Sequence, residues 1–115
     1  MRNYPWYRDW QKRYAGKGVT IIGVHTPESK GEADIESVRK KAKEQDLAFP
    51  IAIDNDKSVW QAWGNRWWPS VYLIDKAGNV RYRWDGELNW QNAGGQEIMR
   101  RKIDALRAEK APALP

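Results

Sequence analysis

The chain has 115 residues, which is enough for one small domain but not for two. Its net charge is +5, but the 20 Lys and Arg residues are spread along the chain, which argues against a nucleic-acid-binding protein. The sequence has no cysteine and no apolar stretch of roughly 20 residues, so it excludes disulfides, thiolate metal sites and a transmembrane helix.

The first predicted element is a helix over residues 5–15. Pro5 suits a first helical turn, and an aromatic stripe follows at helical spacing. The stripe consists of Trp6 and Tyr7, Trp10 and Tyr14. Eight Trp, five Tyr and one Phe are many aromatic residues for this length, so we expect indole rings to dominate the buried core.

A strand and a second helix are predicted next. Residues 19–24 form a nearly continuous apolar run, which is typical of a parallel strand covered on both faces. Asp34 can cap a helix that reaches about Gln45 and is amphipathic. Its apolar stripe is Ile35, Val38 and Ala42, and its basic face is Arg39, Lys40, Lys41 and Lys43. We interpret the basic face as solvated rather than as a nucleic-acid site.

The acidic segment Asp54-Asn55-Asp56 has two interpretations. It follows a short predicted strand, residues 49–53, and precedes a short helix that ends at Gly64, so its side chains can cap that helix. It also resembles the start of a calcium-binding loop, but Asn65 stands where the EF-hand pattern needs its closing Glu. We therefore favour helix capping.

The next segment predicts a β-hairpin. Pro69 cannot donate to a strand ladder, so it belongs at the entrance of the first strand, residues 71–74. Residues 75–79 are a polar, glycine-containing reversal before the second strand, residues 80–84. The residues alone leave open whether the Trp68–Pro69 bond is cis or trans.

The last predicted helix follows a polar loop at residues 85–95. Its buried side is expected to hold Ile98, Met99, Ile103 and Leu106. The element order is then helix, strand, helix, strand, helix, hairpin, helix. This order predicts an α/β domain with a mixed sheet between helices.

Four segments share a family pattern: residues 5–10, 18–28, 53–56 and 65–75. They resemble the thioredoxin-like, TlpA-type thiol-disulfide oxidoreductases. The segments with His25-Thr26-Pro27-Glu28 and Trp68-Pro69 are especially similar to the thioredoxin domain at the carboxyl end of DipZ-type cytochrome biogenesis proteins. The resemblance implies a thioredoxin-like three-layer sandwich over residues 1–110, with residues 111–115 as a flexible tail.

Such proteins carry a W-C-x-x-C motif on the central strand of the sheet. Aligned on Pro5, the second cysteine falls immediately before Met1, so the resemblance implies that this sequence lacks the N-terminal central strand and starts just past the active site. Pro69 is then the cis-proline that faces the cysteines, and Trp68 is the residue whose backbone meets an extended partner. Some relatives have a carboxylate where this chain has Asn3.

Disulfide exchange needs a thiolate, which no other side chain can replace. The chain as written is therefore expected to be redox-inactive, with no catalytic residue, metal ligand or cofactor, and with Trp68 and Pro69 as substrate-binding residues. Two explanations of the missing strand stay open. Either a longer gene encodes it upstream, which we favour, or another chain fills the gap, which includes homo-oligomers formed through exposed strand edges.

The resemblance also implies a partner and a location. The partner is a thiol or disulfide protein, whereas nucleic acid and a membrane segment are not expected. The location is periplasmic or otherwise extracytoplasmic, although residues 1–5 lack the apolar region of a secretory signal peptide.

The main alternative function is a non-catalytic binding module. In it, Trp67 and Trp68 form an aromatic surface for a protein or single-stranded nucleic acid. The basic residues of this surface are Arg66, Arg81 and Arg83.

Two further groups receive structural interpretations. His25 is a polar residue at a strand's end, because no second imidazole or cysteine completes a metal site. The acidic residues near the second helix are expected to favour its positive end rather than to form a catalytic pair. They are Glu28, Glu32, Asp34 and Glu36.

Overall fold

The computed structural model describes residues 3–27, 34–66 and 68–112. The chain divides into two compact units, which we name the parallel unit (Tyr7–Arg66) and the hairpin unit (Met1–Trp6 with Trp67–Pro115). Within the described ranges, no helix is long and apolar enough to cross a bilayer. Most of the predicted tail, residues 113–115, lies outside the described residues.

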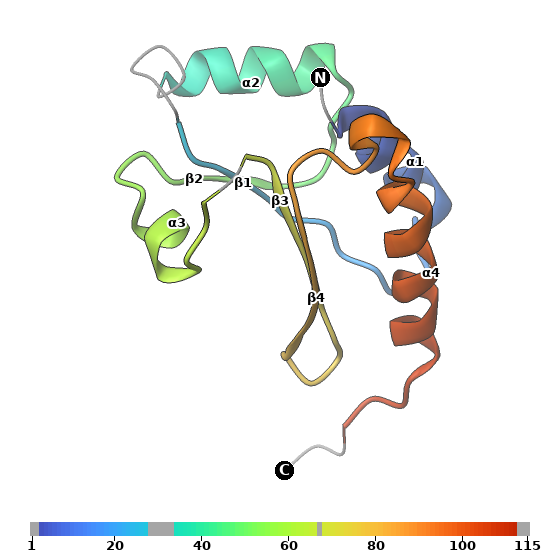
Figure 1. Ribbon diagram of the computed structural model, residues 1–115. Helices are drawn as coiled ribbons and strands as arrows, with labels where there is room; N and C mark the ends of the chain where they lie inside the picture. Colours follow the sequence, from blue (N-terminus) through green and yellow to red (C-terminus); the bar gives the residue numbers. More distant parts are fainter. Residues whose placement is uncertain (1–2, 28–33, 67, 113–115) are drawn as a thin grey trace. The chain divides into compact units, whose positions relative to one another are not determined.

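The described part of the parallel unit contains two short strands and three helical segments. β1 (Gly23–His25) pairs in parallel with β2 (Ile51–Ile53). α2 (Ile35–Glu44) lies on one side of this pair, and α3 (Ser58–Ala62) follows β2 (Figure 1). α1 (Tyr4–Arg13) precedes β1 and lies in this unit from its fourth residue onward.

Side chains of α1 hold the segment that follows α2. Arg8 Nη1 donates to the carbonyl oxygen of Gln45 at 3.0 Å and to its Oε1 at 3.1 Å. Gln11 Oε1 accepts the N–H of Ala48 at 3.0 Å. Since Trp10 lies between these residues and is buried, α1 anchors the unit through one apolar and two polar side chains.

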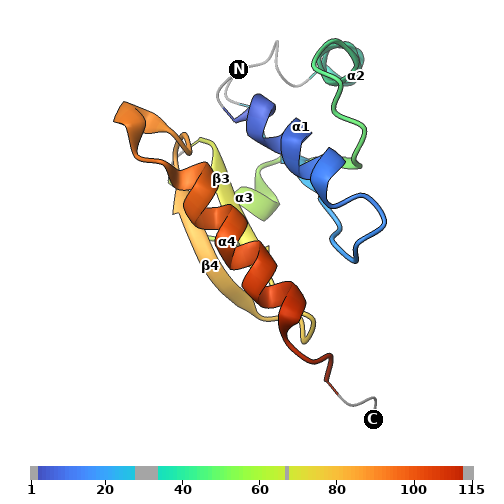
Figure 2. The ribbon, with the colours of Figure 1, turned by 90° about the vertical axis from the view of Figure 1, so that its right-hand side faces the viewer.

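The hairpin unit is an antiparallel pair covered by a helix. β3 (Ser70–Ile74) pairs with β4 (Val80–Asp85), and the register shifts between Leu73 and Ile74. After the short 3-10 helix η2 (Trp90–Asn92), α4 (Gly95–Ala108) runs along the hairpin (Figure 2). The buried apolar residues in the described part of this unit are Leu88, Met99, Ile103 and Leu106. The prediction that Ile98 lies on the buried side of α4 was wrong, because Ile98 is 42% exposed.

The first strand is shorter than predicted. It was expected over residues 19–24 with both faces covered, but it begins at Gly23, and Ile22 and Val24 are 64% and 50% exposed. Among the described strands β1 pairs only with β2, which has three residues, so residues 19–22 have no ladder partner. The prediction of coverage on both faces was therefore wrong.

The strand pairs of the predicted mixed sheet occur as two separate sheets. One is the parallel β1–β2 pair, and the other is the antiparallel β3–β4 pair. No strand in the described part of the chain joins them. Each pair therefore has two outer edges that lack a described neighbour strand.

The expectation that indoles dominate the core was wrong. Among the described tryptophans only Trp10 is buried, whereas Trp63 and Trp90 are exposed. In the parallel unit no residue of α2 is buried, and a groove of about 270 Å³ remains beside it, lined in part by Val38 and Phe49. A two-stranded sheet is too narrow to cover the apolar side chains that surround it.

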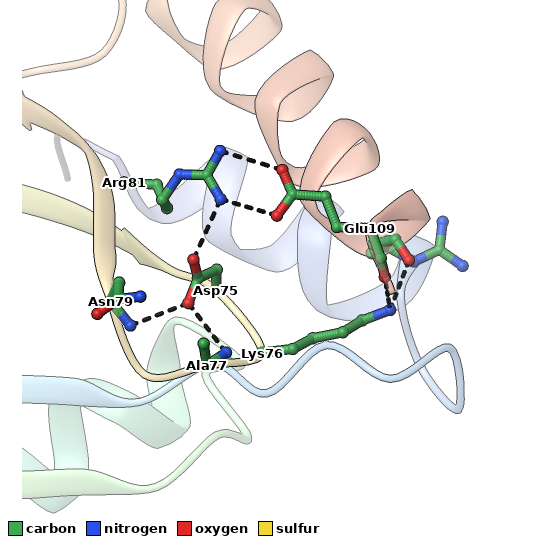
Figure 3. A network of polar contacts seen from close by, with 7 residues as sticks. Asp75, Lys76, Ala77, Asn79, Arg81 and Glu109 are labelled. Carbon is green, nitrogen blue, oxygen red and sulfur yellow. Dashed lines mark hydrogen bonds and ion pairs between the residues drawn. The ribbon is translucent and has the colours of Figure 1, made fainter. Parts of the chain in front are cut away.

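A polar network fixes the hairpin turn (Figure 3). Asp75 Oδ1 accepts the backbone N–H groups of Ala77 at 3.0 Å and Asn79 at 2.9 Å. Its Oδ2 accepts from Arg81 Nη1 at 3.1 Å. The Asn79 N–H is the largest cause that lowers the pKa of Asp75, and Arg81 adds to it against the opposing effect of burial.

The same network ties the turn to the end of α4. Arg81 forms two hydrogen bonds with the Glu109 carboxylate, at 2.7 and 3.1 Å. Lys76 Nζ donates to the carbonyl oxygens of Arg107 at 2.8 Å and Glu109 at 2.6 Å. Because the last carbonyls of a helix lack partners within it, the lysine completes the end of α4.

We predict that Arg81→Gln lowers the thermal midpoint at neutral pH, because it removes the cation shared by two carboxylates. The folded chain lowers the pKa of Asp75, so this stabilisation is present above the ordinary value of 3.8 and is lost as the pH falls below it. Calorimetry across this pH range should show that the thermal midpoints of the variant and the native chain converge in acid.

Arg101→Gln is the matched control, because Arg101 pairs with Glu97 on the surface and is 77% exposed. Arg101→Gln should lower the thermal midpoint at neutral pH less than Arg81→Gln does. A difference between Arg81→Gln and the native chain that is the same at every pH would contradict the proposed role of Asp75.

Candidate functional site

The Trp68–Pro69 bond is cis, which decides the isomer that the residues alone left open. Pro69 stands directly before β3, and its carbonyl oxygen accepts the N–H of Gly86 at 2.7 Å. Ser70 follows and lies opposite Asp85 in the ladder. The site thus joins the start of β3 to the end of β4, and both Trp68 and Pro69 are half-buried.

Asn3 forms the second polar feature of the hairpin unit. It is 1% exposed, and its Oδ1 accepts the N–H of Leu88 at 2.8 Å. The Leu88 carbonyl in turn accepts the N–H of Gly95 at 2.7 Å, at the start of α4. Asn3 therefore links the start of α1 to the segment between β4 and α4.

Gly95 is required by close packing at this link. A Cβ on residue 95 would lie 2.6 Å from the ring of Trp84 and would also collide with the Leu88 carbonyl oxygen. The sequence did not reveal this constraint or the structural role of Asn3. Both depend on residues far apart in the chain, and neither has a local pattern that could have shown them.

Asn3 also limits the chemistry of the site. The resemblance placed a carboxylate of some relatives at this position, where it can carry a proton. An amide does not ionise in the physiological range, and the oxygen of Asn3 already accepts a backbone N–H. The arrangement holds backbone in place and supplies no proton acceptor.

Asp54 in the parallel unit caps α3, as the preferred interpretation of residues 54–56 predicted. Its carboxylate accepts the Thr26 hydroxyl at 2.7 Å and the N–H groups of Val59 at 3.0 Å and Trp60 at 2.9 Å. Burial tends to raise the pKa of Asp54, but these hydrogen bonds together outweigh burial and lower it. A carboxylate whose pKa is lowered and whose oxygens accept three hydrogen bonds is a structural group rather than a general base.

The remaining candidates also have local partners. The His25 carbonyl oxygen accepts the N–H of Asp54 at 2.8 Å, so the backbone of His25 pairs with the residue that follows β2. Asp34 caps α2 through Glu36 N at 3.3 Å, while Glu28 and Glu32 lie outside the described residues. Within the described residues, no three His, Cys, Asp or Glu side chains are grouped so that they could hold a metal ion.

The alternative binding surface is not supported. Arg81 is bonded to Asp75 and Glu109, and Arg83 Nε donates to Asp85 at 2.7 Å, so both guanidinium groups are engaged within the chain. Trp68 is half-buried, and Trp67 lies outside the described residues. No set of exposed indole and guanidinium groups is assembled in the described part of this surface.

The family follows from the sequence as a whole. The profile of the AhpC/TSA family matches residues 2–83. The chain belongs to the AhpC/TSA family. This confirms the predicted relationship to thioredoxin-like redoxin proteins, and the AhpC/TSA domain described here has no cysteine.

Relatives of this AhpC/TSA domain include longer proteins. Protein DipZ of Mycobacterium tuberculosis is 41% identical over 87 residues, which are 76% of this chain and 12% of DipZ. Thiol-disulfide oxidoreductase ResA of Bacillus cereus is 34% identical over 86 residues, 75% of this chain and 47% of ResA. The chain thus spans about an eighth of DipZ and about half of ResA.

Solved structures confirm the thioredoxin-like α/β fold. A putative thiol:disulfide interchange protein DsbE from Chlorobium tepidum superposes with a TM-score of 0.77 at 22% identity, over 91% of this chain and 68% of that one. A putative thioredoxin from Neisseria meningitidis gives 0.72 at 28% identity, over 94% and 66%. The domain is therefore a thioredoxin-like redoxin domain related to thiol-disulfide oxidoreductases.

We predict that Asn3→Ala lowers the free energy of unfolding by about 1–3 kcal/mol, because it leaves the buried N–H of Leu88 without an acceptor. Urea unfolding measures this change. Asn3→Asp is the matched control, since it keeps the acceptor oxygen.

Burial of the new carboxyl in Asn3→Asp raises its pKa, so this variant should approach native stability in acid and lose stability as the pH rises. Equal stability of Asn3→Ala and the native chain would show that the Leu88 N–H finds another acceptor.

We predict that Thr26→Val raises the pKa of Asp54 toward its ordinary value, because a hydroxyl that favours the ionised form is lost. Carboxyl carbon NMR across a pH titration measures this shift. Thr26→Ser keeps the hydroxyl and should leave the titration almost unchanged, whereas an unchanged titration in Thr26→Val would contradict the role of Thr26.

Proposed function

We propose that this AhpC/TSA domain is the partner-binding part of a thiol-disulfide oxidoreductase, whose two cysteines lie on a strand encoded ahead of residue 1. The observation that carries the proposal is the cis Trp68–Pro69 bond at the start of β3, in a redoxin domain that has no cysteine of its own. The relatives DipZ and ResA are longer than the matched segment, which leaves room in such proteins for a cysteine-bearing strand.

The chemistry is a two-electron exchange. A cysteine thiolate attacks one sulfur of a partner disulfide, which breaks the S–S bond and forms a mixed disulfide. The second cysteine then attacks the mixed disulfide, so the partner leaves as a dithiol and the oxidoreductase holds the new disulfide. In this proposal Trp68 and Pro69 orient the extended partner chain, and Asn3 supplies no proton transfer.

The partner in this proposal is a protein with a reactive cysteine pair. The names of two relatives, a thiol-disulfide oxidoreductase and a thiol:disulfide interchange protein, support that class of partner. A location outside the cytoplasm is part of the proposal and rests on the resemblance to DipZ-type proteins. Self-association through an open strand edge belongs to the alternative explanation, in which a second copy fills the gap instead of an upstream strand.

We predict that the 115-residue chain has no thiol-reductase activity and that a chain extended upstream through the W-C-x-x-C strand is active. An insulin-reduction assay compares the two. The extended chain with both cysteines replaced by serine is the matched control and should be inactive. Activity of the short chain, or an upstream reading frame that stops before any cysteine codon, would overturn the proposal.

Partner binding has a separate test in the extended chain with only its first cysteine. Such a chain traps the partner as a mixed disulfide. Trp68→Ala should lower the trapped yield severalfold, because the half-buried indole holds in place the backbone that meets the partner. Trp90→Ala is the matched control, because Trp90 is 63% exposed and lies in η2 of the same unit. An equal loss of trapped yield in the two variants would show that Trp68 is not part of the binding site.

A further inference from the structure

The segment that follows β4, residues 86–88, is held by a hydrogen bond at each of its residues. The Gly86 N–H donates to the Pro69 carbonyl oxygen at 2.7 Å. The Glu87 carbonyl oxygen accepts the indole N–H of Trp84 at 3.2 Å. The first of these bonds places the segment beside Pro69, which directly precedes β3.

The third residue, Leu88, is the buried end of this segment. Its side chain is 0% exposed, and its N–H donates to Asn3 Oδ1 at 2.8 Å. Asn3 is 1% exposed, so this hydrogen bond is out of contact with bulk water. Because an unsatisfied buried N–H is costly, loss of the Asn3 oxygen favours any movement of Leu88 that brings its N–H to another acceptor.

A short path of backbone therefore joins Asn3 to Pro69. Asn3 directly precedes α1, and both residues belong to the hairpin unit. The path has a hydrogen bond at each end and only the backbone of residues 86–88 between them. Since peptide units are rigid, a displacement of Leu88 also moves the Gly86 N–H and the Pro69 carbonyl that it binds.

We propose that Asn3 is a positioning residue, which acts through residues 86–88 to hold the backbone of Pro69 in place relative to the start of α1. The inference rests on the proposed function, in which the cysteines lie ahead of residue 1 and Trp68 and Pro69 orient the partner chain. Asn3 then aligns the partner disulfide with the attacking thiolate and takes no part in the transfer of electrons or protons.

The consequence of losing Asn3 differs between two classes of disulfide. A peptide disulfide brings a backbone that Trp68 and Pro69 orient, whereas a small disulfide without peptide groups gains nothing from that orientation. Misplacement of a positioning group by about 1 Å can cost roughly 100-fold in rate. Loss of the Asn3 oxygen should therefore slow exchange with peptide disulfides and spare exchange with small ones.

Hydrogen exchange in the 115-residue chain tests the hold on Pro69 without any thiol. Asn3→Ala should speed exchange of the Gly86 amide about tenfold more than exchange of the Met99 amide, which lies in α4. Asn3→Asp keeps an acceptor oxygen. In acid, where its buried carboxyl is neutral, the ratio of the two exchange rates should stay close to the native ratio.

Single-turnover exchange in the extended chain that carries W-C-x-x-C tests the effect on the reaction. The probes are insulin, a peptide disulfide, and bis(2-hydroxyethyl) disulfide, which has no peptide group. Asn3→Ala should lower the rate constant for insulin about tenfold and change the rate constant for the small disulfide by less than about twofold.

Ile103→Val is the matched control for a loss of stability alone. It removes a buried methyl group from the same unit, about 12 Å along α4 from Gly95. It should speed exchange of the Gly86 and Met99 amides alike and leave both rate constants close to native.

Two results would overturn the inference: a Gly86 amide that exchanges no faster relative to Met99 in Asn3→Ala, or an equal loss of rate with both disulfides. A failure of the proposed function appears differently. The extended chain with its native Asn3 would then reduce neither disulfide, while hydrogen exchange would still measure the hold of Asn3 on Pro69.

Discussion

In the described part of the chain each sheet has two strands, and a two-stranded sheet is marginally stable in water unless another element packs on it. Helices and polar side chains supply the packing and hydrogen bonds that stabilise these small sheets. In the hairpin unit, α4 buries Met99 and Ile103, and Arg81 ties its end to the turn. In the parallel unit, α1 holds the connection after α2, but α2 itself buries no residue.

Three polar side chains also stabilise the fold by holding backbone groups. Asp54 accepts the first N–H groups of α3, Asn3 accepts the N–H of Leu88, and Asp75 accepts two N–H groups of its turn. Each acts as an acceptor that fixes backbone, and none is poised to move a proton. The redox chemistry of related oxidoreductases therefore has no substitute among these residues, and in the proposed function it comes from cysteines on another strand.

The open strand edges of this domain need a backbone partner, and the proposed oxidoreductase function supplies one. An unpaired strand edge offers a regular row of donors and acceptors, and these groups do not distinguish one extended backbone from another. In the proposed oxidoreductase one such edge borders the strand that carries the cysteines.

The sequence by itself determined the features that depend on neighbouring residues. These are the amphipathic helices, the caps at Asp34 and Asp54, the hairpin after Pro69, and the family resemblance. Only the tertiary structure decided the length of β1 and which indoles are buried. The structure also has the cis bond that the family resemblance implied and that the residues alone left open. It also gave Asn3 a partner 85 residues away. Caps and periodicity act within a few residues, whereas strand pairing and burial depend on segments that only folding brings together.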